Sequence, residues 1–435
     1  MLELSRFHSR LQHADPIAEF GIIEKIVGNT IESHGPNVTM GCVCWLENQG
    51  RRIPVEVVGF TEGKVIAMPL GKIDGIRQGD ILHASGRTAT IGMSEELRGR
   101  ILDGLGRPID DRPMPLLLDR QDLYTDPANP LRRDPIREPL QTGVRAIDGL
   151  LSCGLGQRIG IFGGSGVGKS SLLGMIARYT SADVNVIALI GERGREVREF
   201  IENDLGTEGL KRSIVIASTS DQPALVRIRA AFAATAAAEY FRDRGHNVML
   251  MMDSITRFAM AQREVGLAAG EPPSSKGYTP SVFSLMPKLL ERSGKFAKGS
   301  ITAFYTVLVE GDDMNDPIAD HARSILDGHI VLDRELATRG QYPCIDVLSS
   351  ISRLMPHLVR TELKNAAYEI RDLIATHKKS EDLINIGAYK RGSNHRIDAS
   401  IDRADAIKAF LKQRPEEFSQ LTITQLQLVQ LAQLQ

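Results

Sequence analysis

The sequence predicts an α/β protein with a P-loop core, preceded by a β-barrel and followed by a helical domain. Three observations predict this arrangement. A phosphate-binding motif begins at residue 163, short alternating runs occupy residues 20–90, and helical periodicity occupies residues 361–435. Between the motif and the helical region, apolar strands alternate with helical stretches, which is typical of a mostly parallel sheet.

The phosphate-binding motif fits the pattern G-x-x-x-x-G-K-[ST]. Residues 158–162 before it predict a buried strand, and residues 171–178 after it predict a helix. The backbone N–H groups of such a loop surround phosphate oxygens at a helix N-terminus. We expect Lys169 to reach the β- and γ-phosphates and Ser170 to meet Mg²⁺. The nucleotide-binding residues are then Gly163, Gly164, Ser165, Gly166, Val167, Gly168, Lys169, Ser170 and Ser171.

Two acidic residues follow strand-like runs farther along the chain. Asp253 ends the apolar run 248–252, and parallel sheets bind ligands at the carboxyl ends of their strands. We expect Asp253 to serve Mg²⁺; taken alone, the run would be a core strand with a capping acid. Glu192 follows the run 184–190, and a carboxylate near a γ-phosphate can polarise a water. The alternative for Glu192 is an acid that interacts with a helix dipole.

The core is expected over residues 91–360. Its predicted strands are 158–162, 184–190, 213–218, 248–252, 300–307 and 328–332. Many prolines fall within residues 105–140, which predicts a connecting segment without regular structure. In the helical domain, residues 421–435 repeat Leu and Gln, so they form either an amphipathic last helix or a loose end.

Residues 20–90 are expected to form a small barrel or sandwich, because their strands are short and regularly spaced. The predicted strands are 22–27, 40–46, 53–60 and 64–68. Trp45 is expected in the core of this domain. Residues 1–19 form a separate N-terminal segment, in which Leu2, Leu4, Phe7 and Leu11 could form one face of a short helix that Pro16 would stop.

Composition narrows the class of protein. The chain has 435 residues, 25% of them charged, and a net charge of −1, so no basic excess indicates nucleic acid or an anionic membrane. Cys42, Cys44, Cys153 and Cys344 are expected to be free buried thiols in a reducing cytosol. Asp312, Asp313 and Asp316 look like a metal loop, but a solvated acidic turn is the better interpretation. No run approaches the roughly 18 residues of a membrane span.

Longer stretches resemble the family of hexameric rotary and export ATPases, which includes the catalytic subunits of F-type ATP synthase. These stretches are 97–108, the P-loop, 191–197, 253–264, 277–283 and 342–353. The resemblance runs from about residue 20 to about 412 and is specific for the export branch. Residues 385–393, with Ala388 where virulence type III secretion members typically have Glu, favour the flagellar members of that branch.

The resemblance implies a RecA-like core and a role for each matching residue. Glu192 matches the catalytic glutamate that activates water, and Arg193 matches a residue near the γ-phosphate. Tyr342 matches the aromatic that stacks on adenine. Arg353 matches an arginine finger donated across the subunit interface. One departure is Cys344, where the family usually has Ala, Ser or Pro; an exposed thiol there would make the adenine pocket sensitive to thiol reagents.

The resemblance also implies ATP hydrolysis that drives type III export of flagellar subunits. It implies a homo-hexamer, a regulator at the N-terminal segment, a coiled-coil stalk in the pore, export-gate membrane proteins, and exported subunits with their chaperones. The protein would lie in the cytoplasm, at the inner face of the membrane at the flagellar base. The alternatives are a virulence type III secretion ATPase and a catalytic subunit of a rotary ATP synthase.

Two further alternatives are disfavoured. A non-catalytic subunit of a rotary ATPase would lack the glutamate found at Glu192. A ring helicase needs a basic and aromatic platform for nucleic acid, and residues 20–90 are poor in aromatic residues. We therefore expect no nucleic-acid partner.

Overall fold

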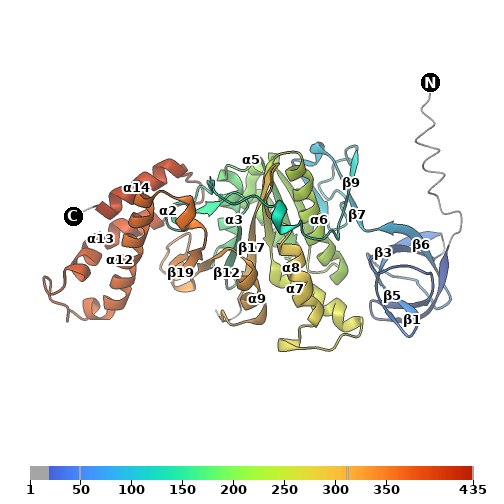
Figure 1. Cartoon of the computed structure of the whole chain (residues 1–435). Coiled ribbons are helices and arrows are strands. Elements are labelled where there is room, and N and C mark those ends of the chain that lie inside the picture. Colours follow the sequence, from blue (N-terminus) through green and yellow to red (C-terminus); the bar gives the residue numbers. More distant parts are fainter. Residues whose placement is uncertain (1–18, 49, 310, 312, 434–435) are drawn as a thin grey trace, which may run out of the picture. The chain divides into compact units, whose positions relative to one another are not determined.

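A computed structural model describes residues 19–433 of the chain except 49, 310 and 312 (Figure 1). The described chain forms two compact units, the first built mainly from residues up to Ala89 and the second from most of the remainder. The division into segments 1–19, 20–90, 91–360 and 361–435 stays a prediction. Leu2, Leu4, Phe7 and Leu11, expected on a docking helix, lie outside the described residues, as does Asp312.

The first unit is a closed barrel, which decides between the two predicted alternatives. Its strands are β1 (Phe20–Val27), β2 (Thr30–His34), β3 (Cys42–Asn48), β4 (Arg51–Thr61), β5 (Lys64–Pro69) and β6 (Ile81–Thr88), joined in the order β1-β2-β5-β4-β3-β6. The sequence did not predict β2 and β6. Both are rich in polar residues. They are strands because their backbones pair with the adjacent strands of the barrel, β6 with β1 and β2 with β5.

The expectation that Trp45 lies in the barrel core is wrong. Side chains of β3 alternate between the two faces of the strand. Cys42, Cys44 and Leu46 point into the core, whereas Trp45 is 36% exposed on the outer face. The large aromatic therefore follows the register set by its smaller neighbours. The prediction that Cys42, Cys44, Cys153 and Cys344 are free and buried is confirmed.

The second unit is built on a large sheet whose strands are nearly all parallel. The order is β19 (Ile345–Ser352), β18 (Gly328–Leu332), β12 (Arg158–Gly163), β17 (Ser300–Leu308), β15 (Asn247–Asp253), β13 (Val184–Ile190), β14 (Ser213–Ser218) and β8 (Arg100–Asp103), with β16 (Gly294–Lys295) paired to β17. The six predicted core strands are confirmed. The two edge strands were not predicted: β8 is short, and β19 runs antiparallel to β18.

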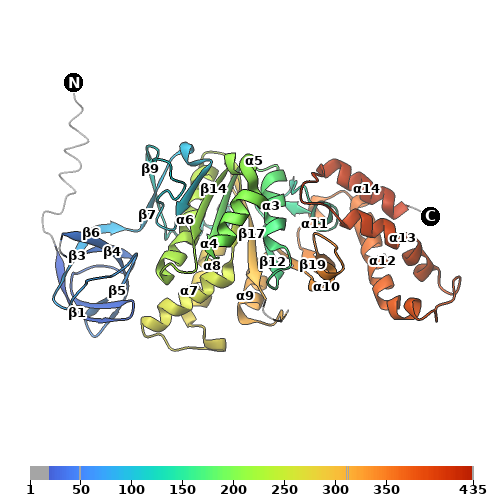
Figure 2. The ribbon, with the colours of Figure 1, turned by 180° about the vertical axis from the view of Figure 1, so that it is seen from behind.

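Helices cover both faces of this sheet (Figures 1 and 2). One face, in front in Figure 2, carries α3 (Lys169–Tyr179), α4 (Gly194–Glu199), the π-helical turn Phe200–Leu205 and α5 (Gly206–Lys211). The face in front in Figure 1 carries α6 (Ala224–Asp243), α7 (Ile255–Ala268), α8 (Pro280–Leu290) and α9 (Pro317–Ile325). This is the result of right-handed crossovers between parallel strands. It leaves the carboxyl ends of β12, β13 and β15 together at one edge of the sheet.

The proline-rich segment is mostly irregular, as predicted. Its regular structure is brief and includes the pairings of β9 (Asp119–Asp122) with β7 (Thr90–Met93) and of β10 (Pro139–Leu140) with β11 (Cys153–Gly154), and a 3-10 turn at Pro130–Arg132. The segment continues into α2 (Arg145–Leu150), which contacts the C-terminal helices.

The C-terminal part is helical, also as predicted. Beyond α10 (Arg334–Thr338) and α11 (Met355–Leu358), it consists of α12 (Thr361–Asn385), α13 (His395–Leu411) and α14 (Leu421–Gln433). Residues 421–433 of the Leu- and Gln-rich tail thus form a helix, and its Leu428 is buried against the core. Arg145 joins α2 to α13, because its side chain donates to the carbonyl oxygen of Phe410 at 2.8 Å. None of the described helices is both long enough and apolar enough to cross a membrane.

Candidate active site

The P-loop connects β12 to α3 at the carboxyl edge of the sheet. Gly168 has a φ of 85°, in the left-handed region that glycine adopts without strain, and caps the N-terminus of α3. Lys169 is buried, and its ammonium group donates to the carbonyl oxygens of Gly163, at 3.1 Å, and Gly164. The loop therefore holds a cation beside the unpaired N–H groups of a helix N-terminus, which together form an anion site.

A cavity of about 810 Å³ opens at this loop. The loop contributes Lys169 and Ser170 to its wall, and the ends of β13 and β15 contribute Glu192 and Asp253. These four residues were predicted separately, from strand ends and a motif, and the parallel sheet brings them to one cavity.

The charged groups of this cavity shift one another's protonation. Burial, and next the Asp253 carboxylate, raises the pKa of Glu192 to about 8. Burial also raises the pKa of Asp253, against a hydrogen bond from Thr306 and the charge of Lys169. The pKa of Lys169 is lowered by burial. The two carboxyl groups and the ammonium group are all shielded from water. The site therefore favours a ligand that brings charges of both signs, such as a metal–phosphate complex.

The donor set fits a magnesium ion that arrives with phosphates. Ser170 and Asp253 offer a hydroxyl and a carboxylate oxygen, which are the hard ligands that Mg²⁺ prefers. Thr306 donates to Asp253 Oδ1 at 2.5 Å and orients that carboxylate. The described residues contain no group of three or more His, Cys, Asp or Glu side chains that could hold a metal by themselves. A metal here would thus take further ligands from substrate and water.

Several charged residues of this cavity were not predicted: Arg257, Glu196, Arg263, Lys276 and Arg334. Arg257 lies on the first turn of α7, four residues after Asp253, and its Cβ would be 3.0 Å from a Cβ built on Gly191. Its Nε is buried without a hydrogen-bond partner. Glu196, on α4, interacts with the side chain of Glu192 and helps to raise its pKa. The available signal for Arg257 was its place in the first turn of a helix that directly follows the strand ending at Asp253.

Arg193 lines the cavity from its rim. Its side chain is 79% exposed and pairs with Glu196 at 3.5 Å. The structure therefore places Arg193 within the candidate site, but more loosely than Arg257, which is partly buried there.

Tyr342 lies against the P-loop. A Cβ built on Gly168 would be 3.6 Å from the Tyr342 ring, and Tyr342 is 45% exposed. The backbone carbonyl of Tyr342 accepts a hydrogen bond from the N–H of Gln413 at 2.8 Å, which connects it to the C-terminal helices. An exposed aromatic ring beside a phosphate loop can stack on a base. Cys344 is only 1% exposed, so its thiol is not open to this surface.

Arg353 lies apart from the other predicted site residues. It follows β19, whose Ile345 pairs with Leu332 at the P-loop edge and whose Ser352 pairs with Gly328 at the opposite edge. The neighbouring strand β12 spans six residues between these edges, or roughly 20 Å at about 3.3 Å per residue. Arg353 therefore cannot reach the cavity of its own subunit.

Fold and site together define a P-loop ATPase. Residues 143–352 match the model of the ATP synthase alpha/beta family, nucleotide-binding domain, and residues 359–430 match the T3SS EscN ATPase C-terminal domain. The chain belongs to the family of flagellum-specific ATP synthases and type 3 secretion system ATPases. The expected family and the expected fold class are thereby confirmed.

Relatives of both kinds match over nearly their whole length. The flagellum-specific ATP synthase of Bacillus subtilis is 55% identical, over 94% of either chain. The type 3 secretion system ATPase of Xanthomonas euvesicatoria is 48% identical, over 92% of this chain and 91% of its own. The assembled ATPase EscN of enteropathogenic E. coli superposes with a TM-score of 0.90 at 48% identity, over 95% of this chain and 100% of its own.

Proposed function

We propose that this protein hydrolyses ATP as a ring of identical subunits and drives the export of flagellar subunits by the type III route. One observation carries the proposal. The P-loop, Glu192 and Asp253 line one cavity, whereas Arg353 lies at the opposite edge of the sheet. We infer that each subunit holds the phosphate-binding half of a site and that its Arg353 completes the site of a neighbouring subunit.

Within the cavity, each residue has a distinct task. Lys169 and the loop N–H groups hold the phosphates, and Tyr342 stacks on the adenine. Glu192 accepts a proton from the attacking water, and its raised pKa keeps it close to the working pH of a general base. Arg193, Arg257 and the neighbour's Arg353 stabilise charge on the transferring phosphoryl group.

The metal in this proposal is Mg²⁺, bound together with ATP. Ser170 and Asp253 would hold it, and it would neutralise phosphate charge. Its positive charge would favour the ionised forms of Asp253 and Glu192, opposing the effect of burial on their pKa values.

The proposed assembly is a homo-hexamer with a coiled-coil stalk in its pore. EscN, 47% identical over 95% of this chain, has been solved assembled with its central stalk EscO, which supports this part of the proposal. We further propose that a regulator binds the N-terminal segment 1–19, and that the ring delivers subunits and chaperones to membrane proteins of an export gate. It would then lie at the inner face of the cytoplasmic membrane at the flagellar base.

The second candidate is secretion of virulence proteins through an injectisome. The 48% identity to the Xanthomonas ATPase supports it, and the 55% identity to the Bacillus subtilis flagellar protein favours the first candidate. Complementation separates the two. Expressed in Bacillus subtilis that lacks its flagellar relative, this chain should restore swimming, and Glu192→Gln should not. Failure there, with restored secretion in a Xanthomonas strain that lacks its type 3 ATPase, would reverse the assignment.

A further inference from the structure

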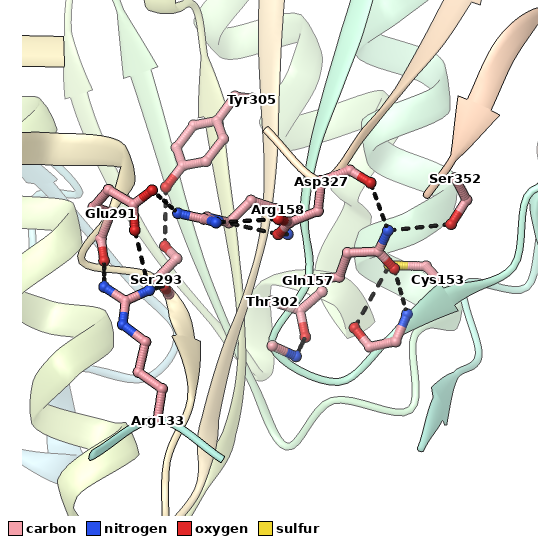
Figure 3. Close-up of polar contacts among 12 residues, drawn as sticks. Arg133, Cys153, Gln157, Arg158, Glu291, Ser293, Thr302, Tyr305, Asp327 and Ser352 are labelled. Carbon is pink, nitrogen blue, oxygen red and sulfur yellow. Dashed lines mark hydrogen bonds and ion pairs between the residues drawn. The ribbon is translucent and has the colours of Figure 1, made fainter. Parts of the chain in front are cut away.

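A cluster of charged and polar side chains lies at the sheet edge opposite the P-loop (Figure 3). At its centre, Asp327 precedes β18 and Arg158 begins β12. The guanidinium of Arg158 donates to both carboxylate oxygens of Asp327, at 3.1 Å each, and its backbone N–H donates to Oδ2 at 3.0 Å. Such two-pronged, charge-assisted bonds fix orientation as well as distance.

The same Asp327 holds the end of β19. Its carbonyl oxygen accepts hydrogen bonds from the backbone N–H of Arg353, at 3.0 Å, and from the side-chain amide of Gln157, at 3.2 Å. That amide also donates to the hydroxyl of Ser352 at 3.1 Å. The residue just before Arg353 and the backbone of Arg353 itself are therefore both bound to the cluster.

The strands touch closely at this point. A Cβ built on Gly328, next to Asp327, would lie 2.6 Å from the carbonyl oxygen of Ile351, so no larger residue fits between β18 and β19 there. The Arg353 side chain, by contrast, is exposed, and its guanidinium donates to the Arg323 carbonyl at 3.2 Å. The backbone of Arg353 is thus held by a hydrogen bond, whereas its side chain is exposed.

Arg158 also faces a second acid. Its guanidinium pairs with Glu291 at 2.5 Å, and Glu291 pairs with Arg133 at 3.2 Å. Figure 3 shows Arg158 lying between Glu291 and Asp327. Of these two acids, only Asp327 is hydrogen-bonded to the backbone of Arg353, through its carbonyl oxygen. A change at Asp327 should therefore affect Arg353, whereas a change at Glu291 should not.

We propose that Arg158 and Asp327 are positioning residues that set the direction in which Arg353 leaves β19. This rests on the proposed function, in which Arg353 completes the site of a neighbouring subunit. β12 begins at Arg158 and ends at the P-loop, so this strand connects the residues that position Arg353 with the phosphate site of the same subunit. A displaced β12 would therefore move Arg353 relative to its neighbour.

The first test is Asp327→Asn, which keeps the shape but replaces one acceptor oxygen with an amide that cannot accept a guanidinium N–H. Turnover should fall by about 10²-fold, since small misplacements of a reacting group cost that much, while KM and ATP affinity stay unchanged. Glu291→Gln is the matched control. It removes the other acid beside Arg158, leaves the bonds of Asp327 in place, and should keep near-normal turnover.

Mixed rings then show which side of the interface has failed. Glu192→Gln subunits can donate Arg353 but cannot hydrolyse ATP, whereas Arg353→Ala subunits can hydrolyse but cannot donate. Activity should return when Asp327→Asn is mixed with Glu192→Gln, because the Glu192→Gln subunits supply well-placed arginines. Activity should stay low in the mixture with Arg353→Ala. A folding or nucleotide-binding defect would not be specific to the donor side.

Arg158→Lys is the second variant; it keeps the charge, loses the paired geometry, and should give the same donor-specific pattern. A loss that is equal in both mixtures, or normal turnover of Asp327→Asn and Arg158→Lys, would overturn the positioning role. Mixing Arg353→Ala with Glu192→Gln provides the reference. If that pair fails to complement, the proposed role of Arg353 falls and the positioning role falls with it.

Discussion

The thiol of Cys344 donates a hydrogen bond to the carbonyl oxygen of Val167, with 2.8 Å between sulfur and oxygen. Val167 belongs to the P-loop, and Cys344 comes two residues after Tyr342. The contact therefore joins the phosphate-binding loop to the segment that we propose to meet the adenine. Burial raises the pKa of the Cys344 thiol and keeps it protonated as a donor.

The burial of the cysteines predicts how fast thiol reagents label the protein. Because all four cysteines are buried and free, a maleimide reagent at neutral pH should label the native protein only slowly, and the denatured protein fully. The number of labelled thiols can be measured by mass spectrometry, with Cys344→Ser as the control. Rapid labelling of Cys344 that ATP prevents would show that the thiol opens to the nucleotide.

Glu192→Gln tests the chemistry of the cavity. The amide keeps the size of the side chain but cannot accept a proton, so turnover should fall by about 10²–10⁴-fold, with ATP binding retained. Phosphate release and calorimetric affinity should be measured on one preparation. Glu196→Gln is the matched control, since Glu196 lines the same cavity, and it should lose much less activity. Comparable losses in the two variants would remove the special role of Glu192.

The same substitution has a pH-dependent effect on stability. Burial raises the pKa of Glu192 from 4.5 to about 8, so folding favours the protonated carboxyl. The stability from this group is full below its unfolded pKa and is lost as the pH rises toward 8. Without nucleotide, Glu192→Gln should melt a few degrees above the wild type at about pH 9, and the gain should shrink toward about pH 5. A constant difference in melting temperature at every pH would contradict the raised pKa.

Arg257 should matter for turnover more than for folding. Its Nε has no hydrogen-bond partner, and its charge lowers the pKa of Glu192. Arg257→Gln should lower turnover by about 10²-fold, as loss of a group that stabilises a transition-state charge does in other enzymes, with little change in melting temperature. Arg263→Gln is the control on the same helix, because Arg263 lines the cavity but lies over the Tyr278 ring, 5.3 Å from its centroid. Equal losses would indicate a general charge effect.

Much of the core could be predicted because each of its strands is indicated by a pattern within one short stretch of the sequence. The strands β13, β14 and β18 have the predicted bounds, since buried parallel strands are short, continuous apolar runs. The P-loop was recognised by its glycine, lysine and serine spacing between a predicted strand and a predicted helix. By contrast, β2 and β6 carry polar residues and are strands only because barrel neighbours pair with them.

The sequence by itself determined the fold class, the phosphate-binding loop and the two acids at strand ends. Only the tertiary structure decided what depends on register and strand direction. Trp45 faces outward because its neighbours in β3 take the inner face, Arg257 joins the site because α7 begins at the carboxyl end of β15, and Arg353 is far from its own cavity because β19 runs antiparallel. These outcomes rest on contacts between residues distant in the chain, which no local pattern of apolar and polar residues encodes.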